Sequence, residues 1–266
     1  MVQEEHKKLY YNEIYPKERE GKYLEIEPAL HDLLKIYSSN VIETDERLFR
    51  AELLLTSSII ALYKKRYSQA RTDAIEASNI FEQCKSWNRL PYALNRVAET
   101  YRFDGDYQSA LEYTGKAIDA LKKAYSENSL ELKKVLPPFE RELADALIKL
   151  ECFSEAERVL CDAYRMAEET GDDFTKGHLA LTLFSLYIRT KELEKAERYL
   201  KIGENVLVTQ AGAQKNIPTE IIVMRDWAKF YLKKGESEKS KNILNQAITI
   251  AKKYGFDYLT GDLENK

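Results

Sequence analysis

The chain has few residues that break or crosslink regular structure: 10 glycines, 6 prolines and 3 cysteines among 266 residues. Because glycine and proline are costly inside helices, their scarcity favours long helices and an all-α fold. An odd number of cysteines without close pairs is typical of a reduced cytosolic protein rather than of a disulfide framework. We therefore expect free thiols, with Cys152 and Cys161 packed in the core.

Long apolar runs are also missing. The first eight residues are polar and of mixed charge, unlike the apolar core of a signal peptide. The most apolar stretch, residues 53–63, is too short to span a bilayer. The formal net charge is −3, whereas nucleic-acid binding requires a basic face. We expect a cytoplasmic protein with no membrane partner and no direct contact to nucleic acid.

Residues that catalyse reactions or bind metals form no recognisable pattern. The three histidines, His6, His31 and His178, have no metal-ligating neighbour three or four residues away. The chain has no glycine-rich phosphate loop and no Gly-x-Ser-x-Gly elbow. Its carboxylates stand among lysines and arginines at helical spacing, as on solvated helix faces. The sequence therefore predicts no metal and no cofactor, and it disfavours an enzyme.

A helical pattern recurs five, and in a degenerate form six, times along the chain. Its clearest copy consists of Ala98, Tyr101, Gly105, Asp106, Tyr107, Ala110 and Ala117. A small residue early in each second helix aligns the copies at intervals of 40, 46, 40 and 44 residues: Ala70, Ala110, Ala156, Ala196 and Ser240. Repeated helical hairpins form solenoids, which mostly bind partners rather than catalyse reactions.

Local signals place the helices within this frame. Apolar residues at helical spacing, such as Leu94, Val97, Ala98 and Tyr101, should form the inner seam of each first helix. We expect residues 1–44 to form a degenerate N-terminal hairpin or cap and residues 45–266 to form the repeat array. Gly171 should cap a helix in the left-handed conformation. Pro91, Pro137 and Pro138 should lie at the starts of first helices.

The copy around Gly105 resembles the tetratricopeptide repeat family, which has this Gly-Asp-Tyr turn and these alanines at matching spacing. The resemblance covers about residues 45–255 and implies a right-handed superhelix of five to six helical hairpins, an α-solenoid. The copies exceed the ~34 residues typical of the family. The Ala-Glu-Glu-Thr-Gly-Asp junction at 167–172 is similar to the sensor domains of Gram-positive peptide-pheromone regulators, the Rap, PlcR, NprR and PrgX-like proteins.

Two family features are not carried over. Transcriptional members of that group have an N-terminal helix-turn-helix domain, for which there is no room before residue 45. A sensor of this type would be a stand-alone form, part of a longer protein, or a member with another output. The chaperone-tail clamp is not implied, because Ile59 and Glu99 occupy its asparagine position.

The resemblance implies a peptide groove lined by first-helix positions that face away from the second helix. Carried onto this chain, these positions are Glu52, Leu55, Ile59 and Tyr63, then Tyr92, Asn95, Glu99, Arg102 and Phe103, then Arg141, Asp145 and Lys149, then His178, Leu181, Ser185 and Arg189, and finally Arg225, Lys229 and Lys233. This groove would begin apolar and acidic and end basic. Arginine forks suit the carboxylates of a peptide, and the amide of Asn95 could clamp a peptide bond. Alternatively, these charges form ordinary solvated helix faces with intrahelical pairs.

These observations favour a non-catalytic regulatory module that binds a short peptide or a protein partner. A peptide that contacts several repeats would select one superhelical pitch. The alternative is an assembly scaffold or homodimer that uses convex surfaces and terminal residues such as Leu9, Tyr10 and Tyr258. Trp87 would either serve a partner at a rim or cap its loop, whereas Trp227 should lie in the core.

Overall fold

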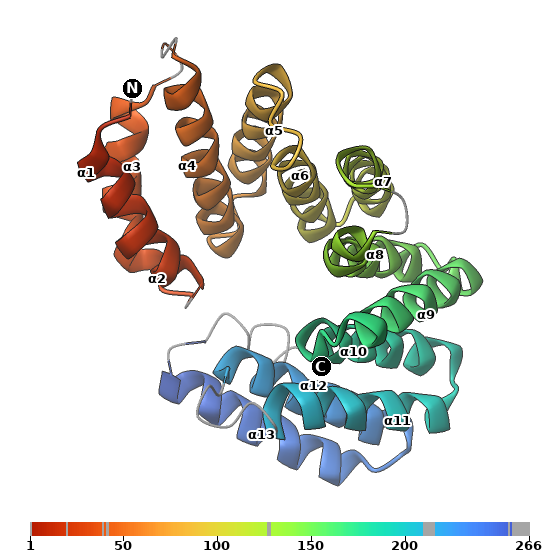
Figure 1. Ribbon diagram of the computed structural model, residues 1–266. Helices are drawn as coiled ribbons and strands as arrows, with labels where there is room; N and C mark the ends of the chain where they lie inside the picture. The colour runs from red at the N-terminus through yellow and green to blue at the C-terminus, as the bar shows by residue number, and fades with distance from the viewer. Residues whose placement is uncertain are drawn as a thin grey trace. The chain divides into compact units, whose positions relative to one another are not determined.

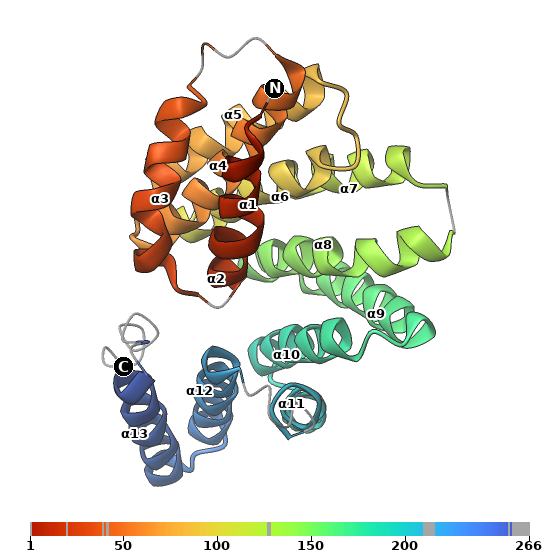
Figure 2. The ribbon, with the colours of Figure 1, turned by 60° about the vertical axis from the view of Figure 1, so that its left-hand side comes forward.

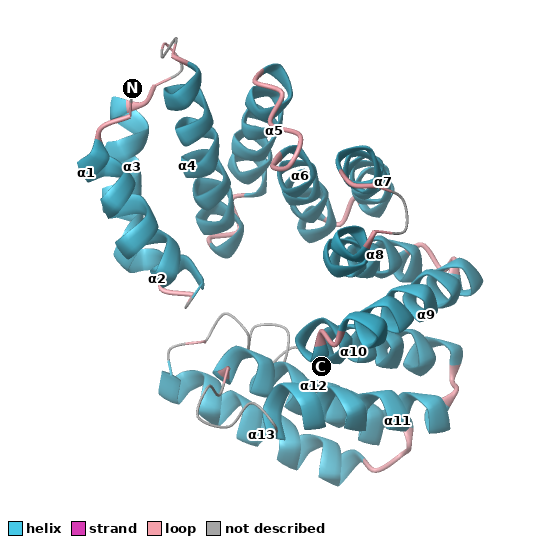
Figure 3. Ribbon diagram, viewed as in Figure 1, coloured by secondary structure: helices cyan, strands magenta, loops and turns pink. Residues whose placement is uncertain are grey.

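The computed structural model describes residues 2–19, 21–38, 40, 43–126, 129–209, 216–254 and 256. The described residues form helices joined by short turns and contain no strand, so the all-α prediction is confirmed (Figure 3). The chain divides into two compact units, Met1–Leu132 (unit 1) and Lys133–Lys266 (unit 2). No helix among the described residues combines the length and the apolar character needed to cross a membrane.

Unit 1 is a series of helical hairpins. Its elements are α1 (Glu4–Leu9), the π-helical turn η1 (Tyr10–Ile14), α2 (Tyr15–Arg19), α3 (Tyr23–Ile36), α4 (Thr44–Tyr63), α5 (Tyr67–Gln83), α6 (Leu90–Asp104) and α7 (Tyr107–Ala124). The segment from α1 to α2 packs beside α3, and the pairs α4 with α5 and α6 with α7 form two regular hairpins (Figures 1 and 2).

Unit 2 continues the same plan. Its elements are α8 (Leu130–Lys149), which begins at the end of unit 1, α9 (Phe153–Thr170), α10 (Asp173–Thr190), α11 (Leu193–Glu204), the π-helical turn η2 (Asn205–Thr209), α12 (Ile217–Lys233) and α13 (Ser237–Tyr254). Here α10 packs on α11, and α12 packs on α13. The first helices of the regular hairpins are α4, α6, α8, α10 and α12, and the second helices are α5, α7, α9, α11 and α13.

The small residues that align the repeats are all buried where two helices meet. Ala70, Ala110, Ala156 and Ala196 are at most 2% exposed, and Ser240 is also buried. Serine hydroxyls join the two helices at both ends of the array. In unit 1, Ser58 donates to the carbonyl oxygen of Ala70 at 2.7 Å, and in unit 2, Ser240 donates to that of Ala228 at 2.8 Å. Small side chains here let the helix axes approach closely, as predicted.

Each regular hairpin turns through one residue in the left-handed conformation. This residue stands five places before the aligned small residue, with φ between 58° and 87°, at Lys65, Gly105, Glu151, Lys191 and Gly235. Glycine adopts this conformation without a Cβ penalty, whereas lysine and glutamate pay about 1 kcal/mol. Gly171 ends α9 with φ 67°, which confirms the predicted left-handed cap.

Two expectations about α8 and the cysteines were wrong. Pro137 and Pro138 lie inside α8 rather than at its start. The helix begins earlier because Leu132 and Leu136 continue the buried stripe upstream, and this burial offsets the hydrogen bonds that proline removes. Cys152 and Cys161 are exposed rather than packed in the core.

The ends and the tryptophans also differ from expectation. Tyr10 is 2% exposed and lies in a core cluster with Ile14 and Phe49, and Leu9 packs against the same cluster, so neither offers an apolar surface at the end of the chain. Tyr258 lies outside the described residues. Trp227 is half-buried, not fully in the core, and stacks on Tyr231.

Candidate functional site

The predicted groove positions lie on the first helices of both units, and each unit is described by itself. We call the positions on α4 and α6 the unit 1 face and those on α8, α10 and α12 the unit 2 face. Two of the predicted lining residues do not belong to these surfaces. Leu55 is buried against Phe81 and Leu90, and Leu181 is buried where α10 meets Gly203 of α11.

The centre of the unit 1 face is an ion pair between neighbouring hairpins. Arg89, just before α6, donates through Nε to Oε1 of Glu52 on α4 at 2.6 Å and through Nη2 to Oε2. The Glu52 side chain is only 16% exposed. Paired hydrogen bonds of this kind are stronger and more specific than a single contact. Glu52 is therefore a neutralised carboxylate rather than an open acidic site, and Arg89 is a site residue that the sequence analysis missed.

Four of the predicted groove residues follow one another along α6: Tyr92, Asn95, Glu99 and Arg102. Tyr92 is 39% exposed and lies beside the Arg89 guanidinium, with 5.6 Å between Cζ and the ring centre. Burial is the main cause that raises the pKa of Tyr92 above its usual value. Glu99 forms a salt bridge with Arg96 on the same helix, and Arg102 lies over the ring of Phe103.

Asn95 stands between these residues and has an unusual environment. Its Oδ1 is buried and accepts no hydrogen bond from any described residue. Leaving such an acceptor unpaired costs about 1–3 kcal/mol. A small rotation that brings the Asn95 amide oxygen to an N–H donor would therefore recover this free energy.

Tyrosines of the N-terminal segment extend the unit 1 face. Tyr11 and Tyr15 are 51% and 42% exposed. The neighbouring Tyr10 is buried against α4, where its hydroxyl donates a hydrogen bond to the carbonyl oxygen of Glu52 at 3.2 Å. The pKa of Tyr11 is raised, first by burial and then by Glu52. In the sequence, the four-residue spacing of Tyr11 and Tyr15 is the signal that indicates a shared helix face.

In the unit 2 face, Arg141 on α8 and both Arg225 and Lys229 on α12 already form ion pairs. Arg141 forms salt bridges with Glu142, which is buried, and with Asp145 at 3.6 Å. On α12, the buried carboxylate of Asp226 contacts Lys229 at 3.0 Å and Arg225 at 3.4 Å. These pairs leave less free positive charge than the predicted basic end would have.

On α10, Arg189 and His178 face α8. Arg189 donates to the carbonyl oxygen of Ile148 at 2.7 Å, near the C-terminal end of α8, where carbonyls need donors. Burial, followed by the positive charge of Arg141, lowers the pKa of His178 to about 4, while Glu142 and Asp172 oppose the shift. His178 is therefore neutral at physiological pH and can both donate and accept a hydrogen bond.

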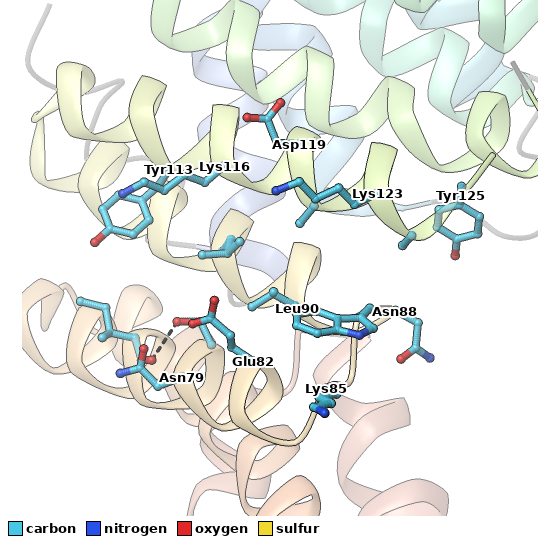
Figure 4. A pocket seen from close by; sticks show the side chains of 16 residues that line it. Asn79, Glu82, Lys85, Asn88, Leu90, Tyr113, Lys116, Asp119, Lys123 and Tyr125 are labelled. Atoms are coloured by element: carbon cyan, nitrogen blue, oxygen red, sulfur yellow. Dashed lines mark hydrogen bonds between the residues drawn. The ribbon is translucent and has the colours of Figure 1, made fainter. Parts of the chain in front are cut away.

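A cavity of about 1030 Å³ lies in unit 1, outside both faces. It is formed by α5, α6, α7 and the loop before α6 that carries Trp87 (Figure 4). Trp87 is 51% exposed at its wall, so it does not simply cap its own loop. Among the described residues, no group of three or more His, Cys, Asp or Glu side chains is placed to hold a metal ion.

Solved structures share this architecture. A Rap protein complexed with competence and sporulation factor superposes with a TM-score of 0.71 at 16% identity, over 99% of this chain and 70% of that one. NprR in complex with its cognate peptide NprX gives 0.68 at 16% identity, over 99% and 74%. A putative kinesin light chain of Podosopora anserina with TPR-like repeats gives 0.56 at 16% identity, over 81% and 99%.

These similarities define the class of the fold: the chain is an all-α protein built from helical hairpins of the tetratricopeptide type. The particular structures that it resembles include the Rap and NprR sensors, as the 167–172 junction implied. At 16% identity the likeness establishes the fold alone. No protein-family model matches the chain, and no curated protein matches it in sequence.

Proposed function

We propose that the protein is a non-catalytic, regulatory module that binds a short peptide on its first-helix faces. Three features support this proposal. The unit 1 face presents partly exposed tyrosine rings beside polar groups, a composition typical of peptide and protein interfaces. Asn95 has an unsatisfied acceptor among them. Solved structures of similar fold hold peptides: a Rap conjugation gene regulator holds the Phr* peptide and NprR holds its cognate peptide NprX, and NprR is a quorum sensor.

The strongest support for peptide binding is the buried, unpaired Oδ1 of Asn95 on α6. An extended peptide offers backbone N–H groups that need acceptors, and one of them would satisfy this atom. On either side of Asn95, Tyr92 and Glu99 follow at helical spacing on the same face. In the unit 2 face, His178 and Ser185 supply neutral polar contacts. The charges of Arg141, Asp145, Arg225 and Lys229 are largely compensated by ion pairs, whereas Arg189 contacts the neutral carbonyl oxygen of Ile148.

The test is to recover the ligand and then weaken its site. The purified protein is incubated with lysate and spent culture medium, and short peptides that remain bound are identified by mass spectrometry. The recovered peptide is synthesised, and its affinity is measured by isothermal titration calorimetry. Tyr92→Ala should weaken binding about ten-fold, because it removes an exposed ring from the unit 1 face.

Tyr254→Ala is the matched control, since Tyr254 is equally a half-exposed tyrosine but lies at the end of the second helix α13. It should leave the affinity unchanged. Equal affinities for the two variants, or the recovery of no peptide from either source, would contradict the proposal.

A further inference from the structure

The cavity in unit 1 is a cleft with two helical walls and a helical floor, which we call the outer cleft. Second helices α5 and α7 form the walls, and Leu90 and Leu94 of α6 form the floor. Both α5 and α7 pack against α6. Small wall residues such as Ser78, Ala120 and Ala124 do not fill the space between the walls. The cleft therefore exists because two second helices share one first helix and face each other with short side chains.

Each wall of the outer cleft carries one carboxylate and, further along the chain, one lysine. Glu82 on α5 and Asp119 on α7 are the carboxylates. Lys123 follows Asp119 by about one turn of α7, and Lys85 follows Glu82 just beyond the end of α5; Lys116, which precedes Asp119 on α7, also lines the cleft (Figure 4). Beyond Lys116, the cleft therefore presents two carboxylates, Glu82 and Asp119, followed by two lysines, Lys85 and Lys123.

None of these four side chains forms a salt bridge with a described residue. Asp119 and Lys123 are four residues apart on α7, a spacing that normally allows an intrahelical pair. Lys85 lies beyond the end of α5 in the left-handed conformation, with φ 56°. In contrast, the neighbouring Lys116 forms a salt bridge with Glu112, with 2.6 Å between Nζ and Oε1. The four groups therefore remain available to charges from outside the chain.

Aromatic side chains complete the cleft. Trp87 and Tyr125 line it together with Tyr113, and Trp87 is half exposed. Exposed tryptophan and tyrosine beside an apolar floor are the residues that most often dominate protein interfaces. A cavity of about 1030 Å³ also exceeds what one inserted side chain would need, because whole ligand pockets measure about 300–1,000 Å³.

We propose that the outer cleft binds an amphipathic helix of a partner protein. Its apolar residues pack on Leu90 and Leu94. Its polar edge carries a basic residue opposite Glu82 and Asp119 and, about one turn away, an acidic residue opposite Lys85 and Lys123. A helix fits this position because its own turn of about 5.4 Å matches the spacing of Asp119 and Lys123 along α7. This site is separate from the first-helix faces and does not depend on them.

The experiment uses a defined probe and a reporter inside the cleft. The probe is a stapled helical peptide of about 14 residues, since unconstrained helices of this length are marginal in water. It carries leucines at i and i+4 and a lysine followed four residues later by a glutamate. Because the chain has only two tryptophans, Trp227→Phe leaves Trp87 as the sole tryptophan. Its fluorescence should change on titration, and anisotropy of a labelled peptide gives an independent affinity.

Interchanging the charges of the probe peptide and of the cleft tests the proposed charge complementarity. A peptide with lysine and glutamate interchanged should bind at least about ten-fold more weakly. The quadruple variant Glu82→Lys, Asp119→Lys, Lys85→Glu, Lys123→Glu should reverse this preference, and these four exposed positions carry little folding risk. An unreversed preference, equal binding of an unfolded proline-containing version, or an unchanged Trp87 signal would overturn the proposal. Self-association of the chain that is lost in the quadruple variant would overturn it too, because the occupant would then be a second copy.

Discussion

The first-helix faces of the two units satisfy their charges differently. In unit 1, Glu52 and Arg89 pair between neighbouring hairpins. In unit 2, Arg141 and Lys229 pair with carboxylates on their own helices. The basic residues of the unit 2 face therefore carry less unpaired positive charge than the number of arginines and lysines in the sequence suggests. The contrast places the stronger candidate contacts on the aromatic and amide groups of unit 1.

The largest expected effect is a loss of folding stability at acidic pH, caused by the buried His178 in unit 2. Above pH 6.5, His178 is neutral in both folded and unfolded chains and costs nothing. As the pH falls from the ordinary pKa of 6.5 toward the folded pKa of about 4, only the unfolded chain gains the proton, so stability falls. At pH 4.5 the loss should approach about 2–3 kcal/mol.

Urea unfolding of the wild type and of His178→Gln at pH 7.5 and pH 4.5 measures this effect. Glutamine removes the titrating group, so the variant should lose less stability between the two pH values. If both proteins lose the same amount, the buried neutral histidine does not control the acid response of unit 2.

The second prediction sharpens the contrast between the two kinds of ion pair. A double-mutant cycle on Glu52→Gln and Arg89→Met should give a coupling free energy of about 1–2 kcal/mol, because the pair is partly buried and has two hydrogen bonds. The same cycle on Arg141 and Asp145 should give only about 0.3–0.5 kcal/mol, as for other i,i+4 pairs. Equal couplings would remove the distinction between the units.

A smaller effect concerns the buried carboxylate of Asp226. Asp226→Asn should lower the free energy of unfolding by about 1 kcal/mol, because Arg225 and Lys229 lose their charged partner. It should also make the unit 2 face more basic and increase the salt dependence of binding for any acidic peptide. Calorimetric titration at low and high salt checks this. Unchanged salt dependence would mean that these cations lie apart from the ligand.

The smallest effect tests what the units have in common. Lys65→Gly in unit 1 and Lys191→Gly in unit 2 should each raise stability by about 0.5–1 kcal/mol, because glycine relieves the left-handed turn. Gly105→Ala should lower it by about 1 kcal/mol. Thermal unfolding of the three variants provides the measurement. A loss of stability in either lysine variant would show that its side chain makes a contact worth more than the turn strain.

The hairpin frame could be predicted because its signals are local. Ala70, Ala110 and their counterparts must be small where helices cross, and the residue five places earlier must accept a left-handed turn. The tandem prolines in α8 misled the prediction, because local propensity opposed a buried stripe that only tertiary packing reveals.

The candidate site was harder to predict, because its properties depend on contacts between helices. Sequence spacing placed Tyr92 and Asn95 on one face of α6, but it could not show that Asn95 has an unpaired acceptor or that Arg89 neutralises Glu52. The outer cleft left no motif in the sequence, since it results from small side chains on two helices about forty residues apart.

The measurement that tests peptide binding on the unit 1 face most directly compares two asparagines of that unit. Asn95 lies on the first helix α6, and Asn79 lines the outer cleft on α5. For the recovered peptide, Asn95→Ala should raise the Kd at least about ten-fold, the equivalent of one strong hydrogen bond, while Asn79→Ala leaves it unchanged. An unchanged Kd for Asn95→Ala together with a raised Kd for Asn79→Ala would contradict the account and assign the peptide to the outer cleft.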